Sequence, residues 1–101
     1  MGQRLPDQVA IVTGAGSVGP GWGNGKATAV LFAREGARVF AVDINLAAAE
    51  ETREIIIAEG GQCNAHQADV SQSADVAAMV QHCLETYGRI DILHNNVGIL
   101  E

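Results

Sequence analysis

The sequence contains few basic residues, and this restricts the partners that it can bind. Lysine and arginine together number 6 against 12 acidic residues, which gives a formal net charge of −6 over 101 residues. Nucleic acids and anionic membrane surfaces are bound through basic patches. The charge balance therefore argues against a nucleic-acid partner and against a membrane partner.

Cysteine is also scarce, and long apolar runs are missing. Cys63 and Cys83 form no Cys-x-x-Cys or metal-ligand spacing, so we expect two reduced, buried thiols in a cytoplasmic protein. No apolar run approaches the roughly 20 residues of a membrane-spanning helix. The segment from Met1 to Pro6 lacks the apolar core of a signal peptide.

The remaining composition is that of a packed globular chain. Hydrophobic residues make up 48% and charged residues 18%. The length suits one small domain or part of a larger one. His66, His82 and His94 fall on three different predicted elements, so we predict no metal site and assign them structural or surface roles.

The stretch from Val9 to Lys26 carries the strongest local pattern. The apolar run Val9–Val12 is short enough for one buried strand, Gly14 begins a glycine-rich loop, and a helical pattern begins after Gly25. Such a loop binds anions because free backbone N–H groups and the positive end of the helix dipole converge there. We interpret it as the pyrophosphate cradle of a dinucleotide; a flexible surface loop is the alternative.

Two glycine registers fit this loop. A Gly-x-Gly-x-x-Gly pattern is formed by Gly14, Gly16 and Gly19. A helix beginning at Gly19 would contain Pro20 and three more glycines, each of which costs about 1 kcal/mol. The better register begins the helix between Gly23 and Gly25, so that Val18 to Trp22 are an insertion in the loop.

A second apolar stretch ends in an acidic residue, Asp43. It lies 20 residues after Gly23, where dinucleotide-binding folds place the acid that binds the ribose hydroxyls. A helix N-cap or a turn is the alternative role. The loop has no lysine or arginine before Lys26 and none just after Asp43, so nothing there would neutralise a 2′-phosphate. This predicts NAD in preference to NADP.

Strands and helices are predicted to alternate along the whole chain. We expect strands at about 9–12, 38–42, 63–68 and 90–94, and helices at about 24–35, 46–59 and 73–87. We expect Asn45 to cap the second helix, and the helices to end at Gly36, Gly60 and Gly88. Such alternation predicts right-handed βαβ crossovers. The predicted fold class is α/β, part of a Rossmann-type doubly wound parallel sheet with strand order 3-2-1-4 and helices on both faces.

On these residues the chain resembles the N-terminal half of a short-chain dehydrogenase/reductase. The segments Thr13-Gly14 and Gly23-Asn24-Gly25 are similar to the family's Thr-Gly-x-x-x-Gly-x-Gly, and Asn95-Asn96-Val97-Gly98 is similar to its Asn-Asn-Ala-Gly. The resemblance covers nearly all of residues 1–101, which would be the N-terminal half of an NAD(P)-binding domain. It implies hydride transfer between a nicotinamide cofactor and an alcohol or ketone.

The resemblance also implies roles for individual residues. Asp69 would meet the adenine amine, Val70 would pack on the adenine ring, and Asn96 to Gly98 would lie beside the cofactor ribose. Helix entry for Asp69 and strand-end hydrogen bonds for Asn95 and Asn96 are alternatives that do not exclude these roles. The predicted cofactor-binding residues are Gly14, Gly16, Ser17, Gly23, Asn24, Gly25, Asp43, Asp69, Val70, Asn96, Val97 and Gly98.

The sequence departs from the family pattern in the loop and in the catalytic residues. Trp22, in the insertion, either covers the pyrophosphate or is a half-buried loop residue. The family's serine and Tyr-x-x-x-Lys pair have no counterpart, since Tyr87 is followed four residues later by Asp91 and the only lysine is Lys26. We therefore assign no catalytic residue and expect the chain alone to be inactive.

Three functions remain open from the sequence. The chain is the NAD(H)-binding half of an oxidoreductase, which meets a small alcohol or ketone only in a full-length form; or a non-catalytic nucleotide-binding or redox-sensing module; or an inactive structural fragment. The fourth predicted strand, 90–94, would have one unpaired edge, which invites pairing with another chain. We expect a homo-oligomer or a marginally stable chain.

Overall fold

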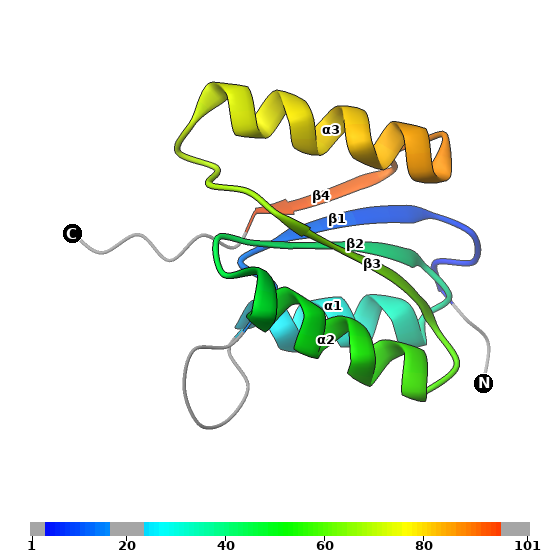
Figure 1. The fold of residues 1–101 in the computed structure, drawn as a ribbon. Coiled ribbons are helices and arrows are strands. Elements are labelled where there is room, and N and C mark those ends of the chain that lie inside the picture. Colours follow the sequence, from blue (N-terminus) through cyan, green and yellow to red (C-terminus); the bar gives the residue numbers. More distant parts are fainter. Residues whose placement is uncertain (1–3, 17–23, 96–101) are drawn as a thin grey trace.

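The computed structural model describes residues 4–16 and 24–95, which form one sheet with helices on both faces (Figure 1). The elements are β1 (Val9–Thr13), α1 (Asn24–Arg34), β2 (Arg38–Asp43), α2 (Leu46–Ala58), β3 (Gln62–Gln67), α3 (Ser73–Tyr87) and β4 (Ile92–Asn95). All three strand pairings are parallel, and the order is β3-β2-β1-β4. The predicted fold class and strand order are confirmed.

The helix ends follow the capping residues. The Asn45 side chain accepts a hydrogen bond from the Ala48 amide at 3.3 Å, which caps α2. The three glycines predicted to end the helices have positive φ angles of 98°, 88° and 81°, at Gly36, Gly60 and Gly88. A left-handed backbone at these positions is available to glycine without steric cost.

The strand β4 begins two residues later than the sequence predicts. The first pair between β1 and β4 is Ala10 with Ile92. Because β1 begins at Val9, only one residue earlier, β1 offers no partner for a strand that begins at Ile90. Asp91 instead closes the entry to the sheet: its backbone N–H donates to the Val9 carbonyl at 2.9 Å, and its Oδ2 accepts from the Val9 amide at 2.9 Å. The Val9 amide is thus hydrogen-bonded to the Asp91 side chain and not to a backbone carbonyl of a longer β4.

Two buried clusters lie on the two faces of the sheet. The cluster under α1 and α2 includes Ala10, Val12, Val39 and Ala41. The cluster under α3 includes Val9, Ile11, Phe40 and Val42. Burial on both faces is expected for parallel strands covered by crossover helices. Cys63 and Cys83 are both buried free thiols, as predicted, and burial raises their pKa values to about 12 and about 11.

None of the helices in the described ranges combines the length and apolarity that crossing a bilayer requires.

Two histidine rings are in contact where β3 faces α3. The ring of His66, on β3, lies 5.3 Å from the Phe40 ring and 5.0 Å from the ring of His82, on α3. Burial lowers the pKa of His66, the neighbouring His82 lowers it further, and Asp75 opposes both. These surroundings therefore favour the neutral form of His66 where α3 meets the sheet.

We expect the free energy of unfolding to decrease as the pH falls below the ordinary histidine pKa of about 6.5. His66 binds a proton more weakly in the folded than in the unfolded chain, so the loss is complete only below its folded-state pKa. Urea unfolding at about pH 7.5 and about pH 5.5, for the wild type and for His66→Gln, measures this. An equal decrease for both proteins would contradict the assignment to His66.

Candidate functional site

The carboxyl ends of the four strands form one rim of the sheet. The strands end at Thr13, Asp43, Gln67 and Asn95. Thr13 pairs with Asn95 on one side and with Val42, the residue before Asp43, on the other, and Asp43 pairs with Gln67. The segments that follow the strands, including Gly14 after β1 and Asp69 after β3, therefore lie along the same rim. The structure brings together the predicted site residues that fall in the described ranges.

Asp43 is held by backbone amides from two segments. Its Oδ2 accepts a hydrogen bond from the Gly16 amide at 2.9 Å, and its Oδ1 accepts one from the Asn45 amide at 2.9 Å. The contact with Asn45 is the turn role that the sequence left as an alternative. Each carboxylate oxygen has two lone pairs, so these bonds leave acceptor sites for a hydroxyl donor.

The glycine loop rests on α2. A Cβ atom added to Gly16 would come within 2.8 Å of the carbonyl carbon of Ala48. Thr52, one turn further along α2 and fully buried, donates its hydroxyl to the Ala15 carbonyl at 2.8 Å. The sequence analysis missed Ala48 and Thr52. The signal that could have found them is their four-residue spacing, which places both on one face of the helix.

A Thr52→Val variant is expected to be less stable than the wild type by about 1–3 kcal/mol. Valine keeps the shape of threonine but leaves the Ala15 carbonyl without this donor. Thr52→Ser loses a methyl group and keeps the hydroxyl, so it should be more stable than Thr52→Val. Urea unfolding measures both, and a valine variant at least as stable as the serine variant would contradict this role.

The first turn of α1 is positively polarised. No acidic side chain occupies it, although acidic residues stabilise this end of a helix. The Lys26 side chain is buried, with 5% exposed, and its ammonium group lies 2.8 Å from a carboxylate oxygen of Glu51 on α2. The backbone N–H groups at Asn24 and Gly25 begin this helix beside the rim. This end of α1 therefore suits an anion.

Asp69 follows β3 and leads into α3. Its Oδ1 accepts hydrogen bonds from the backbone N–H and the hydroxyl of Ser71, at 3.0 and 2.6 Å, and these bonds lower the pKa of Asp69. The Asp69 amide donates to Asp75 at 2.8 Å. Helix entry is thus a role that Asp69 fulfils. Its Oδ2 has no hydrogen bond to any described residue, and Val70 packs beside it on the α3 cluster.

Asn95 closes the rim on the other side of β1. The Thr13 hydroxyl donates to the Asn95 side-chain oxygen at 2.6 Å, which confirms a strand-end hydrogen bond for Asn95. Five of the predicted site residues lie outside the described residues, and their roles stay predictions: Ser17, Gly23, Asn96, Val97 and Gly98. The same holds for Trp22.

Tyr87 lies at the opposite end of the molecule from the rim. It ends α3, which runs back towards the beginnings of the strands (Figure 1). Its hydroxyl donates to the Asn64 side-chain oxygen at 2.7 Å, and burial raises its pKa to about 12. A proton-transfer residue needs a pKa near the working pH. Tyr87 is a packing residue of its helix, as the sequence predicts.

Among the described residues, no three histidine, cysteine, aspartate or glutamate side chains gather where they could hold a metal ion. The histidines instead take part in ring contacts: His66 with His82, and His94 with Phe32.

The family described as short chain dehydrogenase matches residues 8–101. A cyclohexanol dehydrogenase from Acinetobacter sp. (strain SE19) is 39% identical over 100 residues, which are 99% of this chain and 38% of that protein. The short-chain dehydrogenase/reductase homolog YusS of Bacillus subtilis (strain 168) is 43% identical over 95 residues, which are 92% of this chain and 82% of YusS.

The fold is similar to that of a solved structure from the same family. The crystal structure of a Burkholderia xenovorans protein assigned to the short-chain dehydrogenases/reductases superposes with a TM-score of 0.91 and 52% sequence identity. The match covers 96% of this chain and 38% of that protein. The chain thus spans less than half the length of the Acinetobacter and Burkholderia relatives, and most of the length of YusS.

Proposed function

Because this chain belongs to the short-chain dehydrogenase/reductase family, we propose that it binds NAD(H) at the rim where its strands end. The observation that carries the proposal is Asp43, a strand-end carboxylate hydrogen-bonded to the glycine loop at Gly16. A carboxylate at this place accepts hydrogen bonds from the hydroxyls of the adenosine ribose, and it repels the 2′-phosphate of NADP. The nicotinamide ring, when bound, supplies the site for hydride transfer.

The described residues have the chemistry that such a cofactor needs. The first turn of α1 offers backbone N–H groups to the pyrophosphate. In the neighbouring loop, the N–H groups of Ala15 and Gly16 instead donate to the Val42 carbonyl and to Asp43, which holds the loop at the rim. The free Oδ2 of Asp69 can accept from the adenine amine, and Val70 offers an apolar surface beside it. Glycine is required in this loop, because a side chain at Gly16 would meet the backbone of α2.

The experiment that tests the proposal is a pair of titrations of this chain, one with NADH and one with NADPH, followed by cofactor fluorescence. We expect saturable binding of NADH with an affinity at least tenfold higher than that for NADPH, which corresponds to about 1.4 kcal/mol. Equal affinities would contradict the preference for NAD. The absence of binding by both cofactors would contradict the proposed function.

The oxidoreductase activity that we propose belongs to a longer form of the protein, in the cytoplasm. The Acinetobacter relative is a cyclohexanol dehydrogenase, which supports an alcohol or ketone as the substrate class. The described ranges place no tyrosine at the rim, since Tyr87 lies at the other end of the sheet. We therefore propose that the 101-residue chain binds cofactor without turning over substrate.

A non-catalytic nucleotide-binding module is the second candidate function. It is favoured by the short length of YusS, because the match with this chain covers 82% of YusS. The two candidates share the cofactor site and differ in what happens when the remainder of a full-length relative is supplied. Dehydrogenase activity of the combined chains supports the first candidate, and cofactor binding without activity supports the second.

A further inference from the structure

Two ion pairs join α1 to α2. The Lys26 ammonium group lies 2.8 Å from a carboxylate oxygen of Glu51, and the Arg34 guanidinium group lies 2.7 Å from a carboxylate oxygen of Glu59. The two basic residues are eight positions apart on α1, and the two acidic residues are eight positions apart on α2. At 1.5 Å per residue, about 12 Å of helix separates the pairs. Both helices begin at the rim, so the Lys26 pair lies beside it and the Arg34 pair lies further away.

The helix dipole and solvent exposure distinguish the two basic residues. Arg34 is in the last turn of α1, where the dipole favours a positive charge, and its side chain is 56% exposed. Lys26 is in the first turn, where the dipole disfavours a positive charge. Its side chain is also buried, so its charge has been removed from water, which costs free energy. Stability therefore favours a charge at Arg34 and disfavours one at Lys26.

The surroundings of Lys26 leave a positive potential at the first turn of α1. The Glu51 side chain is 61% exposed, so water screens its carboxylate more strongly than the buried ammonium group. No acidic side chain lies in the first turn itself. The next residue on α2 is Thr52, whose hydroxyl donates to the Ala15 carbonyl of the glycine loop at 2.8 Å. The charge of Lys26 thus lies in the region where α1, α2 and the glycine loop meet.

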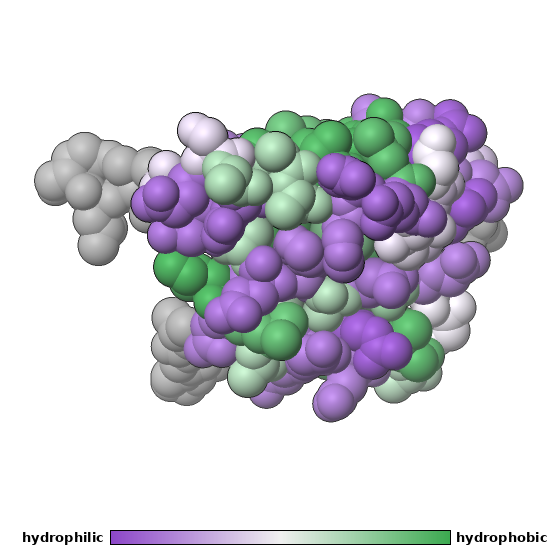
Figure 2. Space-filling view, turned by 45° about the horizontal axis from the view of Figure 1, so that its top comes forward, coloured by the Kyte–Doolittle hydropathy of each residue, from purple (hydrophilic) through white to green (hydrophobic). Residues whose placement is uncertain are grey.

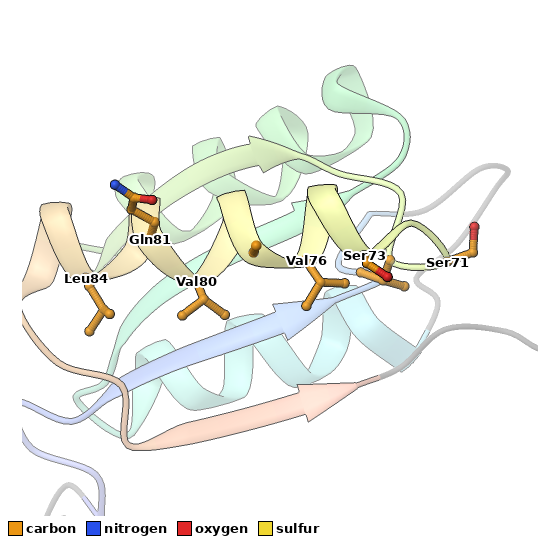
Figure 3. A pocket seen from close by; sticks show the side chains of 8 residues that line it. Ser71, Ser73, Val76, Val80, Gln81 and Leu84 are labelled. Atoms are coloured by element: carbon orange, nitrogen blue, oxygen red, sulfur yellow. The ribbon is translucent and has the colours of Figure 1, made fainter.

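The groove beside α3 offers no comparable place for an anion. It has a volume of about 720 Å³, and no lining residue is charged. Figure 3 shows Val76, Val80 and Leu84 projecting from α3 towards this groove. Figure 2 shows hydrophobic surface gathered at the top of the molecule, where α3 lies. Since α3 covers the face of the sheet opposite to α1 and α2 (Figure 1), the groove is remote from the charge of Lys26.

We propose that Lys26 is an electrostatic determinant of cofactor affinity. Its buried charge adds to the dipole of α1 and attracts the pyrophosphate to the first turn through its field, without contact with the cofactor. This inference rests on the proposed function, because it assigns a further residue to the same site. Glu51 has two opposing effects here. It holds the ammonium group beside the first turn, and its own negative charge weakens the attraction for an anion.

The test is a titration of NADH into the wild type, Lys26→Met and Glu51→Gln, followed by cofactor fluorescence. Methionine is apolar and similar to lysine in length, so it fills the same buried space. In Lys26→Met we expect about tenfold weaker NADH binding, as for a charge that acts through a medium of intermediate dielectric constant. In Glu51→Gln we expect about threefold tighter binding, because the opposing negative charge is gone. Glu51→Gln should nevertheless be less stable, since Lys26 loses its carboxylate partner.

The matched controls are Arg34→Met and Glu59→Gln. They remove the same charges from the ion pair that lies further from the rim, on the same two helices. We expect NADH affinities within about twofold of the wild type, because solvent screens these exposed charges. Adenosine, which carries no phosphate, is the second ligand. In competition titrations, adenosine should bind equally well to Lys26→Met and to the wild type.

Urea unfolding separates the effect of the charge from a merely structural link between the helices. If the ion pair acts only as a link, Lys26→Met and Glu51→Gln should both bind NADH more weakly. That result would overturn the proposal. Equal NADH affinities in Lys26→Met and the wild type, or equal losses in Lys26→Met and Arg34→Met, would also overturn it. In each of these cases the wild type still binds NADH, so the proposed function stands. A wild type that does not bind NADH would contradict the proposed function and this inference together.

Discussion

An Asp43→Ala variant is expected to bind NADH at least tenfold more weakly than the wild type. The substitution removes the acceptor that we assign to the ribose hydroxyls, and hydrogen bonds to charged groups contribute about 1.5–3 kcal/mol each. It also removes the contact that holds the Gly16 amide at 2.9 Å. Both effects weaken binding at the rim.

The affinity for NADPH separates these two effects. If Asp43 acts on the ribose, its removal also abolishes repulsion of the 2′-phosphate, so the preference for NADH over NADPH should shrink. If the role of Asp43 is purely structural, the substitution should lower the affinities for NADH and NADPH by the same factor and leave their ratio unchanged. Glu54→Ala, an exposed change on α2 that also removes one negative charge, is the control. An unchanged NADH affinity in Asp43→Ala would remove Asp43 from the site.

A Gly16→Ala variant is expected to lose both stability and cofactor affinity. The added Cβ would overlap the Ala48 side chain and approach the Ala48 carbonyl carbon and oxygen to 2.8 and 3.0 Å. These backbone atoms belong to α2 and cannot rotate away. Overpacking of this kind costs about 1–3 kcal/mol. The loop would move away from α2, and we expect NADH affinity to fall at least tenfold.

Gly60→Ala is the matched control for this substitution. Gly60 has a φ of 88°, so alanine is strained there, but a Cβ would meet nothing within 4 Å. We expect a loss of stability of about 1–2 kcal/mol with unchanged NADH affinity. Urea unfolding and NADH titration of both variants distinguish the two cases. Normal NADH binding by Gly16→Ala would contradict the close packing of the loop on α2 as a requirement of the site.

The sequence predicts the features that depend on local pattern and on the geometry of parallel sheets. Short apolar runs separated by helical periods specify the alternation of elements, and right-handed crossovers leave few possible strand orders. Asp43 could be placed at the rim because it directly follows an apolar run. The same reasoning located Asn45 as a helix cap and Tyr87 as a packing residue.

The contacts between α2 and the glycine loop could not be read from the sequence in this way. Thr52 and Ala15 lie 37 positions apart, which is beyond the span of any local motif. Their hydrogen bond depends on how α2 packs on the sheet. Lys26 and Glu51 are joined for the same reason. The uneven cover of β4 is likewise a tertiary property, since Ile92 and Leu93 are both apolar and only packing separates their exposure.

The most direct test of the central claim is a titration of isotope-labelled chain with NAD⁺, followed by amide chemical shifts in ¹⁵N–¹H spectra. We predict that the largest shifts fall on the rim, at Gly14, Gly16, Asp43, Asp69 and Val70, with small shifts at the opposite end, near Tyr87. Shifts confined to the α3 groove, or spread evenly over both ends of the sheet, would contradict a dinucleotide site at the carboxyl ends of the strands.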